Sequence, residues 1–376
     1  MRLLLAITLL IVTGWLAPKA NAAQPPGTLL AVRAMPGAPD GAAAWRILYT
    51  SIGPSGAPIE VSGVVIIPAG PAPPEGRPIV AWAHPTTGIV ERCAPSLARV
   101  FFESVQGLSD MLDRGYIIAA TDYPGLGTPE VHPYLVGVSE ARAVLDSVRA
   151  ARQIAGSGAS TRYAVWGHSQ GGHAALFTGL LAQSYAPELQ LVGVAAAAPA
   201  TDLGTLMADD LGTGGGNNIT AMTLWSWSRV YGAPMTPLVT PQAVPVINHL
   251  AQLCIERWFD MLIRRGPTRA LEKSFLRVDN LTDIEPWRAL LAENSPAPLP
   301  SAIPVFIAQG TADGLVRPAV TATYVHALCQ QGSKVRILLM RDVGHAFIAR
   351  DAAPEAVAWI ASRFANAAVP NDCGRT

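Results

Sequence analysis

The feature that most constrains the fold of this 376-residue chain is a repeated alternation of short apolar runs with helix-like segments. The apolar runs have strand length and strand composition, and they occupy residues 61–67, 79–82, 116–121, 163–166, 191–197, 305–308 and 335–340. The helix-like segments carry apolar residues at helical spacing, and they cover residues 99–114, 138–155, 171–184, 318–330 and 353–364. Because strands that alternate with helices form βαβ units, we expect an α/β fold with a mostly parallel sheet flanked by helices.

One stretch interrupts this alternation. Residues 201–300 contain no clear strand, but they contain helix-like segments at 244–264 and 269–277. A loop of that length without secondary structure is rare in a compact domain. We therefore expect residues 201–300 to form a mainly helical cap, or lid, inserted into an α/β domain made of residues 23–200 and 301–376.

The composition excludes two broad classes of protein. Half of the residues are hydrophobic and 14% are charged, with 27 basic and 27 acidic side chains. Disordered chains combine low hydrophobicity with high net charge, whereas this chain has enough apolar residues for a sizeable core. Proteins that bind nucleic acids need clustered Lys and Arg to neutralise phosphates. The balanced charge therefore argues against a nucleic-acid partner.

The N-terminus has the pattern of an export signal. Arg2 gives a short basic start, residues 3–16 are almost entirely apolar, and Ala-Asn-Ala at 20–22 fits the small-x-small cleavage pattern. The apolar run of about 14 residues is shorter than the ~20 residues that span a bilayer. We therefore predict a signal peptide at residues 1–22 that is removed. The mature chain is then exported, secreted or periplasmic, and has no transmembrane anchor.

Export bears on the four cysteines of the chain, which are Cys93, Cys254, Cys329 and Cys373. An oxidising compartment favours disulfides, so we expect two of them. Four cysteines allow three pairings, and their spacing does not choose between them. Because the sequence has no C-x-x-C element, we expect no metal site.

The clearest chemical signal is the pentapeptide Gly-His-Ser-Gln-Gly at residues 167–171, with Ser169 at its centre. It has the form G-x-S-x-G, follows the predicted strand at 163–166 and precedes the predicted helix at 171–184. Glycines on both sides of a serine allow a turn sharp enough to hold the hydroxyl clear of the backbone. A turn without chemistry is the alternative, but the strand before it and the helix after it favour a nucleophilic serine.

A nucleophilic serine needs a histidine base held by a carboxylate, because its hydroxyl is too weak an acid to attack alone. In this architecture the chain order is serine, acid, histidine. Of the later histidines, His173 lies in the helix after the serine, His249 in the cap and His326 in another predicted helix. His345 comes a few residues after the last predicted strand, where a loop can place its ring over the sheet edge. We therefore predict His345 as the base.

Three aspartates compete for the role of the acid. Asp313 follows the predicted strand at 305–308 directly, and such sheets place their sites beyond the carboxyl ends of the strands. Asp342 is only three residues from His345, and we expect it to shape that turn. Asp283 belongs to the cap. We therefore favour Asp313 over Asp342 as the acid.

Attack on a carbonyl creates an oxyanion, which needs backbone N–H donors that are already in place. One donor should be Gln170, the residue after the nucleophile, at the positive end of its helix. The other should come from the loop at 83–88, where Pro85 has no N–H, so Thr86 or Thr87 must donate. A simple turn is the alternative interpretation of that loop. Chemistry of this kind requires no metal and no organic cofactor.

Several stretches of the chain form one recognisable set. They are the signal peptide, His-Pro-Thr-Thr-Gly at 84–88, Glu-Arg-Cys-Ala-Pro-Ser at 91–96, Asp-Tyr-Pro-Gly-Leu-Gly at 122–127, Gly-His-Ser-Gln-Gly-Gly at 167–172, Gly-Thr-Ala-Asp at 310–313 and Gly-His at 344–345. This set resembles the secretory lipase family of α/β-hydrolases, found in fungi and bacteria, over essentially the whole mature chain. The resemblance implies the α/β-hydrolase fold and hydrolysis of carboxylic esters, with Ser169, Asp313 and His345 as the catalytic triad.

The resemblance also implies a disulfide pairing, Cys93 with Cys254 and Cys329 with Cys373. The chain departs from the family at one point, since the family often has His-Gly where this chain has His84-Pro85. That departure leaves the second oxyanion donor open between Thr86 and Thr87.

These features predict an exported serine ester hydrolase, a lipase or carboxylesterase, that works through an acyl-enzyme. Its partner is a small-molecule or lipid ester, with transient contact to lipid surfaces. A peptidase or amidase with the same triad is the first alternative. A non-catalytic binding protein of the same fold is the second, although such proteins normally lose a triad member.

Overall fold

The structure is a computed structural model that describes residues 24–209, 211–256 and 260–374. The signal peptide predicted at residues 1–22 lies outside the described residues. Within the described ranges, no helix is both long enough and apolar enough to cross a membrane.

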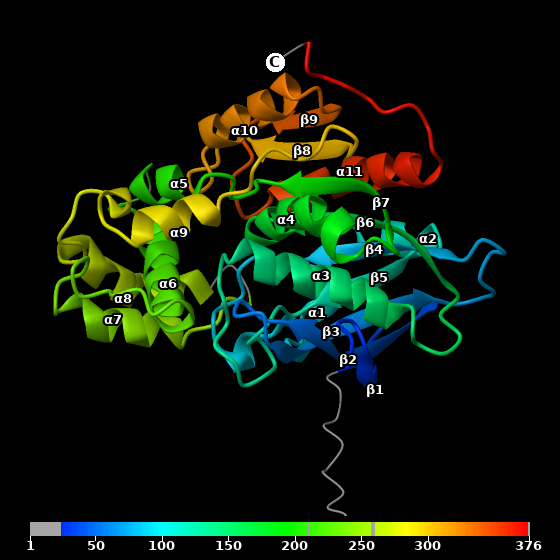
Figure 1. The fold of residues 1–376 in the computed structure, drawn as a ribbon, viewed down its shortest axis with the longest axis horizontal. Coiled ribbons are helices and arrows are strands. Elements are labelled where there is room, and N and C mark those ends of the chain that lie inside the picture. Colours follow the sequence, from blue (N-terminus) through cyan, green and yellow to red (C-terminus); the bar gives the residue numbers. More distant parts are fainter. Residues whose placement is uncertain (1–23, 210, 257–259, 375–376) are drawn as a thin grey trace, which may run out of the picture.

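A nine-stranded sheet forms the centre of the described structure (Figure 1). Its strands, in chain order, are β1 (Leu29–Met35), β2 (Ala42–Ile52), β3 (Pro58–Pro68), β4 (Arg77–Ala83), β5 (Ile117–Thr121), β6 (Ala159–His168), β7 (Gln190–Ala197), β8 (Val305–Gly310) and β9 (Val335–Met340). The spatial order is β1-β2-β3-β5-β4-β6-β7-β8-β9, and all neighbours from β5 to β9 pair in parallel. The expected α/β fold with a mostly parallel sheet is confirmed.

Two strands at one edge of this sheet, β1 and β2, were not predicted from the sequence. β1 pairs antiparallel with β2, and β2 pairs antiparallel with β3. β1 is mostly exposed and carries Arg33, and the β2 segment contains Arg46 within a run of small and mixed residues. Strands of this mixed composition lack the continuous apolar run by which buried parallel strands are found in a sequence.

Helices cover both faces of the sheet (Figure 1). One face packs against α3 (Gly137–Ala151), α4 (Gln170–Tyr185) and α10 (Pro318–Gln330), and the other against α1 (Phe101–Ser104), α2 (Leu108–Asp113) and α11 (Ile348–Phe364). A hydrophobic core lies on each face of the sheet. Successive side chains of a strand point to opposite faces, so in β6 Val165 belongs to the core under α3, α4 and α10 and Trp166 to the core under α1, α2 and α11.

The helix expected at 99–114 is two short helices, α1 and α2, separated around Gly107. The φ of Gly107 is +79°, in the left-handed region, and a Cβ atom there would lie 2.8 Å from Val357 Cγ2. Only glycine fits this close approach without strain, so the chain turns here and packs against α11.

The segment between β7 and β8 is helical where it is described. It contains α5 (Leu203–Asp209), α6 (Gly214–Val230), α7 (Ala243–Ala251), α8 (Asp260–Lys273), the short 3-10 helix η3 (Leu281–Asp283) and α9 (Trp287–Glu293). We call this group of elements the helical insertion. The two helices expected at 244–264 and 269–277 have different bounds in the structure. The first, α7, ends at Ala251, and the second, α8, covers Asp260–Lys273 and so includes parts of both predicted segments.

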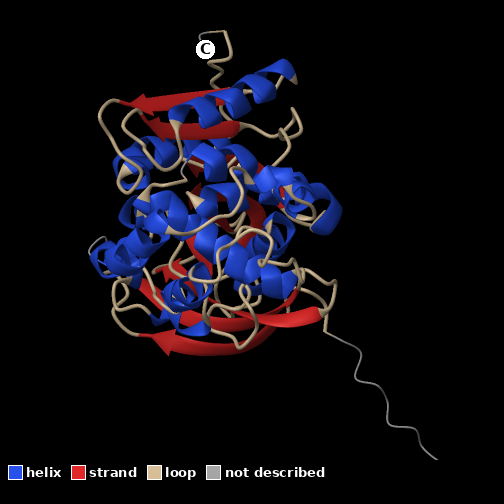
Figure 2. Cartoon of the chain, turned by 90° about the vertical axis from the view of Figure 1, so that its left-hand side faces the viewer, coloured by secondary structure: helices blue, strands red, loops and turns tan. Residues whose placement is uncertain are grey.

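The helical insertion lies beside the sheet at the side where β6 and β7 end (Figure 1). Figure 2 views the molecule from that side and shows helices and loops in front of the central part of the sheet. Trp227 of α6 stacks on Trp287 of α9 with ring centroids 6.0 Å apart, and its Nε1 donates to the carbonyl of Tyr134 at 2.8 Å. The insertion is therefore bonded to the segment before α3, and its buried residues continue the core that lies on the α11 face of the sheet.

Candidate active site

Ser169 occupies the turn between β6, which ends at His168, and α4, which begins at Gln170. Its backbone has φ 57° and ψ −117°, a conformation that costs about 1–3 kcal/mol for a residue with a side chain. A Cβ atom at Gly167 would lie 2.0 Å from the Gly171 carbonyl oxygen, and one at Gly171 would lie 1.8 Å from the Ala83 oxygen. The flanking glycines are therefore what allows the strand and helix to close on so sharp a turn.

The structure brings Ser169, His345 and Asp313 into one chain of hydrogen bonds. His345 Nε2 lies 2.8 Å from Ser169 Oγ, and His345 Nδ1 lies 2.8 Å from Asp313 Oδ2. In the neutral tautomer with a proton on Nδ1, the histidine donates to the carboxylate and accepts from the serine hydroxyl. This arrangement can remove the serine proton while the carboxylate holds the imidazole in place.

The carboxylate of Asp313 is held in its charged form. Asp313 is 4% exposed, and its Oδ1 accepts from the backbone N–H groups of Leu315 at 2.9 Å and Val316 at 2.8 Å. Burial alone would raise the pKa, but the hydrogen bond and the charge of His345, with these two N–H groups, outweigh it and lower the pKa below its ordinary value. Asp313 is therefore a carboxylate at neutral pH.

Asp342 lies in an exposed turn. Its φ is 58°, and its N–H donates to Thr311 Oγ1 at 2.9 Å. Aspartate tolerates the left-handed region better than most residues, so Asp342 shapes the turn before His345. The geometry favours Asp313 as the acid.

Two backbone segments meet beside Ser169. The N–H of Gln170 is the first of α4, and the first N–H groups of a helix have no partner within the helix and lie at its positive end. The loop at 83–88 packs directly on this helix start, since a Cβ atom at Gly171 would lie 2.7 Å from the His84 oxygen. Thr86 Oγ1 pairs with the Tyr134 hydroxyl at 2.9 Å, and the Thr87 carbonyl accepts from Ile255 N–H at 2.8 Å. Both threonines stay candidates for the second oxyanion donor.

Disulfides join Cys93 to Cys254 and Cys329 to Cys373. The first of them lies against the loop at 83–88, because a Cβ atom at Gly88 would lie 2.6 Å from Cys93 Sγ. Together with the Ile255–Thr87 hydrogen bond, this disulfide ties the loop to the helical insertion.

Replacing Cys93 and Cys254 together by Ser should lower stability and kcat at the same time. Opening a loop of 161 residues should cost about 5 kcal/mol in the chain-entropy description. A loosened loop should also slow catalysis by roughly tenfold, since oxyanion donors act only when they are held in position. Thermal unfolding and ester kinetics measure the two effects.

The matched control is the double Ser variant of Cys329 and Cys373. These two cysteines close a loop of 44 residues, and that loop does not include residues 83–88. It should lower stability and leave kcat unchanged. An unchanged kcat in the Cys93 and Cys254 variant would contradict the role of that disulfide in holding the loop.

A buried polar cluster behind Ser169 was missed by the sequence analysis. Glu140 of α3 and His173 of α4 are both fully buried, with Glu140 Oε2 2.7 Å from His173 Nδ1. His173 Nε2 lies 2.7 Å from the Asn294 carbonyl oxygen, to which it donates. The sequence identifies His173 only as a residue of the helix after Ser169, and no spacing in the sequence links it to Glu140.

Two more buried histidines surround the site. His168 Nε2 donates to the carbonyl of His345 at 3.0 Å, and burial, together with the charge of His345, lowers the pKa of His168 to about 3. His132 Nδ1 donates to the Pro124 carbonyl at 2.7 Å, and burial lowers the pKa of His132 to about 4. Both rings are therefore neutral in the folded protein at neutral pH.

These lowered pKa values predict a loss of stability in mild acid. Between about pH 6.5 and about pH 4, His132 is protonated in the unfolded chain and neutral in the folded protein. Stability should therefore fall as the pH drops through this window, by up to about 1.4 kcal/mol per pH unit for this histidine. The free energy of unfolding in urea, measured at pH 6.5 and pH 5, tests this for the wild type and His132→Asn. The wild type should lose about 2 kcal/mol more than the variant, and equal losses would contradict the prediction.

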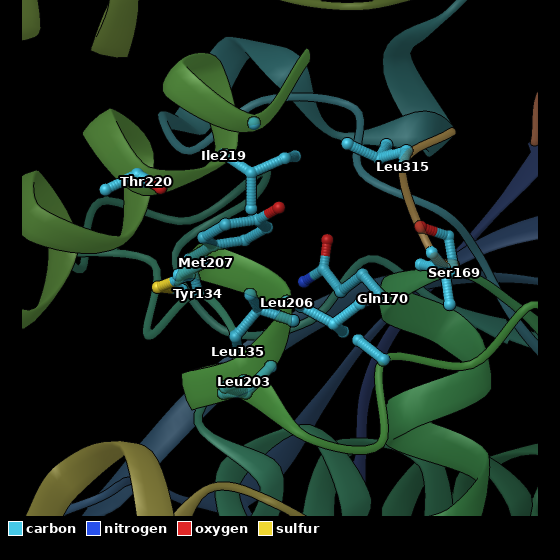
Figure 3. A pocket seen from close by; sticks show the side chains of 13 residues that line it. Tyr134, Leu135, Ser169, Gln170, Leu203, Leu206, Met207, Ile219, Thr220 and Leu315 are labelled. Carbon is cyan, nitrogen blue, oxygen red and sulfur yellow. The ribbon is translucent and has the colours of Figure 1, made fainter. Parts of the chain in front are cut away.

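A small apolar cavity of about 40 Å³ lies between Ser169 and the helical insertion (Figure 3). Leu203, Leu206 and Met207 of α5 and Ile219 of α6 are among the apolar residues of its wall. Gln170 and Thr220 also line it. Its volume is well below the ~300 Å³ of the smallest usual ligand pockets.

The α/β-hydrolase fold is defined by the sheet topology, by the flanking helices and by the sharp turn after β6 that carries Ser169, which we call the elbow. Among solved structures, the chain is similar to Candida antarctica lipase A in its closed state, with a TM-score of 0.80 and 19% identity over 93% of this chain and 85% of that chain. It is also similar to a rice cell wall degrading esterase, LipA, from Xanthomonas oryzae, with a TM-score of 0.76 and 21% identity over 92% of this chain and all of that one. These likenesses confirm the fold.

The sequence profile of the secretory lipase family matches residues 102–371. The chain therefore belongs to the secretory lipase family, as the resemblance implied. Lipase 2 of Candida albicans is 26% identical over 89% of this chain and 74% of its own length. Membership in this family supports lipid ester hydrolysis, and together with the two disulfides it indicates export.

One relative bears directly on activity. A protein of Mycobacterium tuberculosis named "Probable inactive lipase" is 30% identical over 48% of this chain and 43% of its own length. Membership in the family therefore does not by itself establish turnover. Catalysis by this chain depends on the residues at its own site.

Proposed function

We propose that this chain is a serine ester hydrolase that cleaves carboxylic esters, lipid esters among them, through an acyl-enzyme intermediate. The observation that carries the proposal is the pair of 2.8 Å contacts that link Ser169 Oγ to His345 and His345 to Asp313. A buried carboxylate, a histidine and a serine on a strained elbow are the parts that nucleophilic acyl transfer requires.

In the proposed reaction, His345 Nε2 takes the proton of Ser169 as Oγ bonds to the ester carbonyl carbon. The carbonyl oxygen becomes an oxyanion, stabilised by the N–H of Gln170 and that of Thr86 or Thr87. The bond to the alcohol oxygen then breaks, and the proton on His345 passes to that oxygen. Water, activated by the same histidine, hydrolyses the acyl–serine ester and restores the enzyme.

We further propose that residues 23–200 and 301–376 form the catalytic domain and that residues 201–300 act as a lid. The cavity of about 40 Å³ beneath α5 and α6 is too small for a long acyl chain, so these helices must shift for such a substrate to enter. The apolar lining then suits the acyl part of an ester, and opening the insertion brings the site into contact with a lipid surface.

The proposal is tested by labelling with a serine-directed fluorophosphonate, followed by peptide mapping. Labelling should fall on Ser169 and should disappear after prior reaction with an ester-like inhibitor. The absence of an adduct on Ser169 would favour a non-catalytic binding protein. The mycobacterial relative is named an inactive lipase.

Esters and amides with the same acyl group separate ester hydrolysis from peptidase or amidase activity. We expect hydrolysis of the esters, with rates that depend on acyl length, and little hydrolysis of the matched amides. Faster turnover of the amide would assign the same residues to an amidase.

A further inference from the structure

Tyr134 connects the cavity beside Ser169 with the loop at 83–88. Its side chain is buried and lines the cavity together with Ser169, and Figure 3 shows its aromatic ring among the side chains of the cavity wall. The Tyr134 hydroxyl lies 2.9 Å from Thr86 Oγ1. Within the described ranges, neither of these two oxygens has another hydrogen-bond partner. The contact therefore links one wall of the cavity to the loop that carries the second oxyanion donor.

The backbone of Tyr134 is fixed at both of its polar groups. Its N–H donates to Ser226 Oγ at 3.1 Å, and its carbonyl accepts from Trp227 Nε1 at 2.8 Å. Both partners are buried and lie near the end of α6. The α6 residues that line the cavity lie nearer the start of the helix, and they are Gly216, Ile219 and Thr220. The anchor of Tyr134 is therefore separate from the part of α6 that must shift for an acyl chain to enter.

The residue after Tyr134 adds to this rigidity. Leu135 has a φ of 55°, and its N–H donates to Glu140 Oε1 at 3.1 Å. Glu140 is fully buried, and the same oxygen accepts from Gln170 Nε2 at 2.7 Å. A leucine stays in the left-handed region only where its surroundings hold it there. Glu140 therefore fixes the segment that carries Tyr134 against the start of α4.

The residues around Thr86 are held by other contacts. The carbonyl of His84 accepts from the Tyr123 hydroxyl at 3.2 Å, and the carbonyl of Thr87 accepts from a backbone N–H of the helical insertion at 2.8 Å. The N–H and the carbonyl of Thr86 have no hydrogen-bond partner in the part of the chain that the structure describes. The bond to the Tyr134 hydroxyl is therefore the contact that fixes Thr86.

We infer that Tyr134 is a positioning residue of the oxyanion site, whose hydroxyl holds Thr86 so that the Thr86 N–H acts as the second oxyanion donor. This inference rests on the proposed ester hydrolysis and decides between the two candidate threonines. An oxyanion donor must be free of other acceptors and held in place before charge develops, and Thr86 meets both conditions.

Tyr134→Phe tests the positioning role, because it removes the hydroxyl and keeps the ring in the cavity. We expect kcat to fall roughly tenfold with KM unchanged, since the bond acts on a group that is used in the transition state. Esters of several acyl lengths separate this role from that of a cavity wall. The loss should be the same for every acyl length, because the carbonyl group is the same. A change confined to KM, or a loss that grows with acyl length, would overturn the inference.

Thr86→Val completes a double-mutant cycle. Valine keeps the shape of the side chain and the backbone N–H but removes Oγ1. The kcat should fall by a factor similar to that of Tyr134→Phe, and the double variant should fall no further, because all three lack the same contact. Losses that multiply in the double variant would overturn the inference. So would an unchanged kcat in Thr86→Val, even if Tyr134→Phe fails to fold.

The donor itself is tested in the backbone. Replacing the amide that joins Pro85 to Thr86 by an ester deletes the Thr86 N–H and leaves the side chain in place. We expect kcat to fall by about a hundredfold, the lower end of the loss seen when an oxyanion donor is removed. A larger fall from the same replacement at the N–H of Thr87 would assign the donor to Thr87 and overturn the inference.

The matched control is a second tyrosine–threonine pair. The hydroxyl of Tyr49 in β2 lies 2.6 Å from Thr121 Oγ1 in β5, and it also donates to the Ala143 carbonyl at 3.0 Å. Both side chains are buried, and neither belongs to the loop at 83–88. Tyr49→Phe should lower the melting temperature and leave kcat unchanged. If Tyr49→Phe lowered kcat as much as Tyr134→Phe does, kcat would report lost stability, and the positioning role would be wrong.

Failure of the inference is distinguishable from failure of the proposed function. If the wild type hydrolyses esters and Tyr134→Phe retains its kcat, only the positioning role is wrong. If the wild type hydrolyses no ester and takes no fluorophosphonate on Ser169, the proposed function is wrong, and the positioning role falls with it.

Discussion

Ser169→Ala should abolish ester turnover, with a fall in kcat on the order of 10⁶, the size seen when the nucleophile of a serine protease is removed. The reason is that, among the residues the structure describes, Ser169 carries the one hydroxyl bonded to His345, with its Oγ 2.8 Å from His345 Nε2. The fold should survive, because the serine side chain contributes one hydrogen bond at the surface of the cavity. Ester kinetics and thermal unfolding measure the two properties.

The matched control for this prediction is Ser147→Ala. Ser147 is a buried serine of α3, and its hydroxyl donates to the Val144 carbonyl at 2.7 Å, away from the site. Its activity should stay within about threefold of the wild type. If Ser169→Ala retained activity within tenfold of the wild type, the assignment of the nucleophile would be wrong.

Asp313→Asn should lower kcat by about 10⁴, the loss seen when the aspartate of a protease triad becomes an amide. An amide at this position can donate to His345 Nδ1, which favours the tautomer with its proton on Nε2, and that nitrogen then cannot accept the serine proton. The pH dependence of kcat, measured with the same ester, records the loss of the histidine base.

Asp342→Asn is the control for the acid. Asparagine tolerates the left-handed backbone of this position as well as aspartate does, so the turn should persist. We expect a loss of less than about a hundredfold, since Asp342 is exposed and bonds through its backbone to Thr311. The reverse ranking of the two variants would move the acid to Asp342.

Much of the fold followed from local patterns. The seven predicted runs correspond to β3 through β9, because these strands are largely apolar and are bounded by turn residues. β1 and β2 were not found, since strands with mixed and exposed residues look like loops in a single sequence. The division of the predicted helix 99–114 depends on the contact of Gly107 with Val357 of α11, which no local pattern contains.

The candidate site also has one part that could be predicted from the sequence and one part that could not. Ser169, Asp313 and His345 could be singled out because each follows a strand, and the carboxyl ends of parallel strands meet at one edge of the sheet. Their separations along the chain, 176 residues for His345 and Ser169 and 32 for His345 and Asp313, do not matter once the sheet is formed. The choice between Thr86 and Thr87 depends on the path of one loop, which a strand pattern does not define.

The sequence by itself determined the strands β3 to β9, the turn that carries Ser169 and the short set of residues able to act with it, because these depend on local propensity and on topology. Only the tertiary structure decided which polar groups stand behind the site. Glu140 meets His173 across 33 residues, and His132 meets Gln170 across 38. Such contacts form because a buried polar group must find a partner wherever packing places one, and packing leaves no periodic trace in the chain.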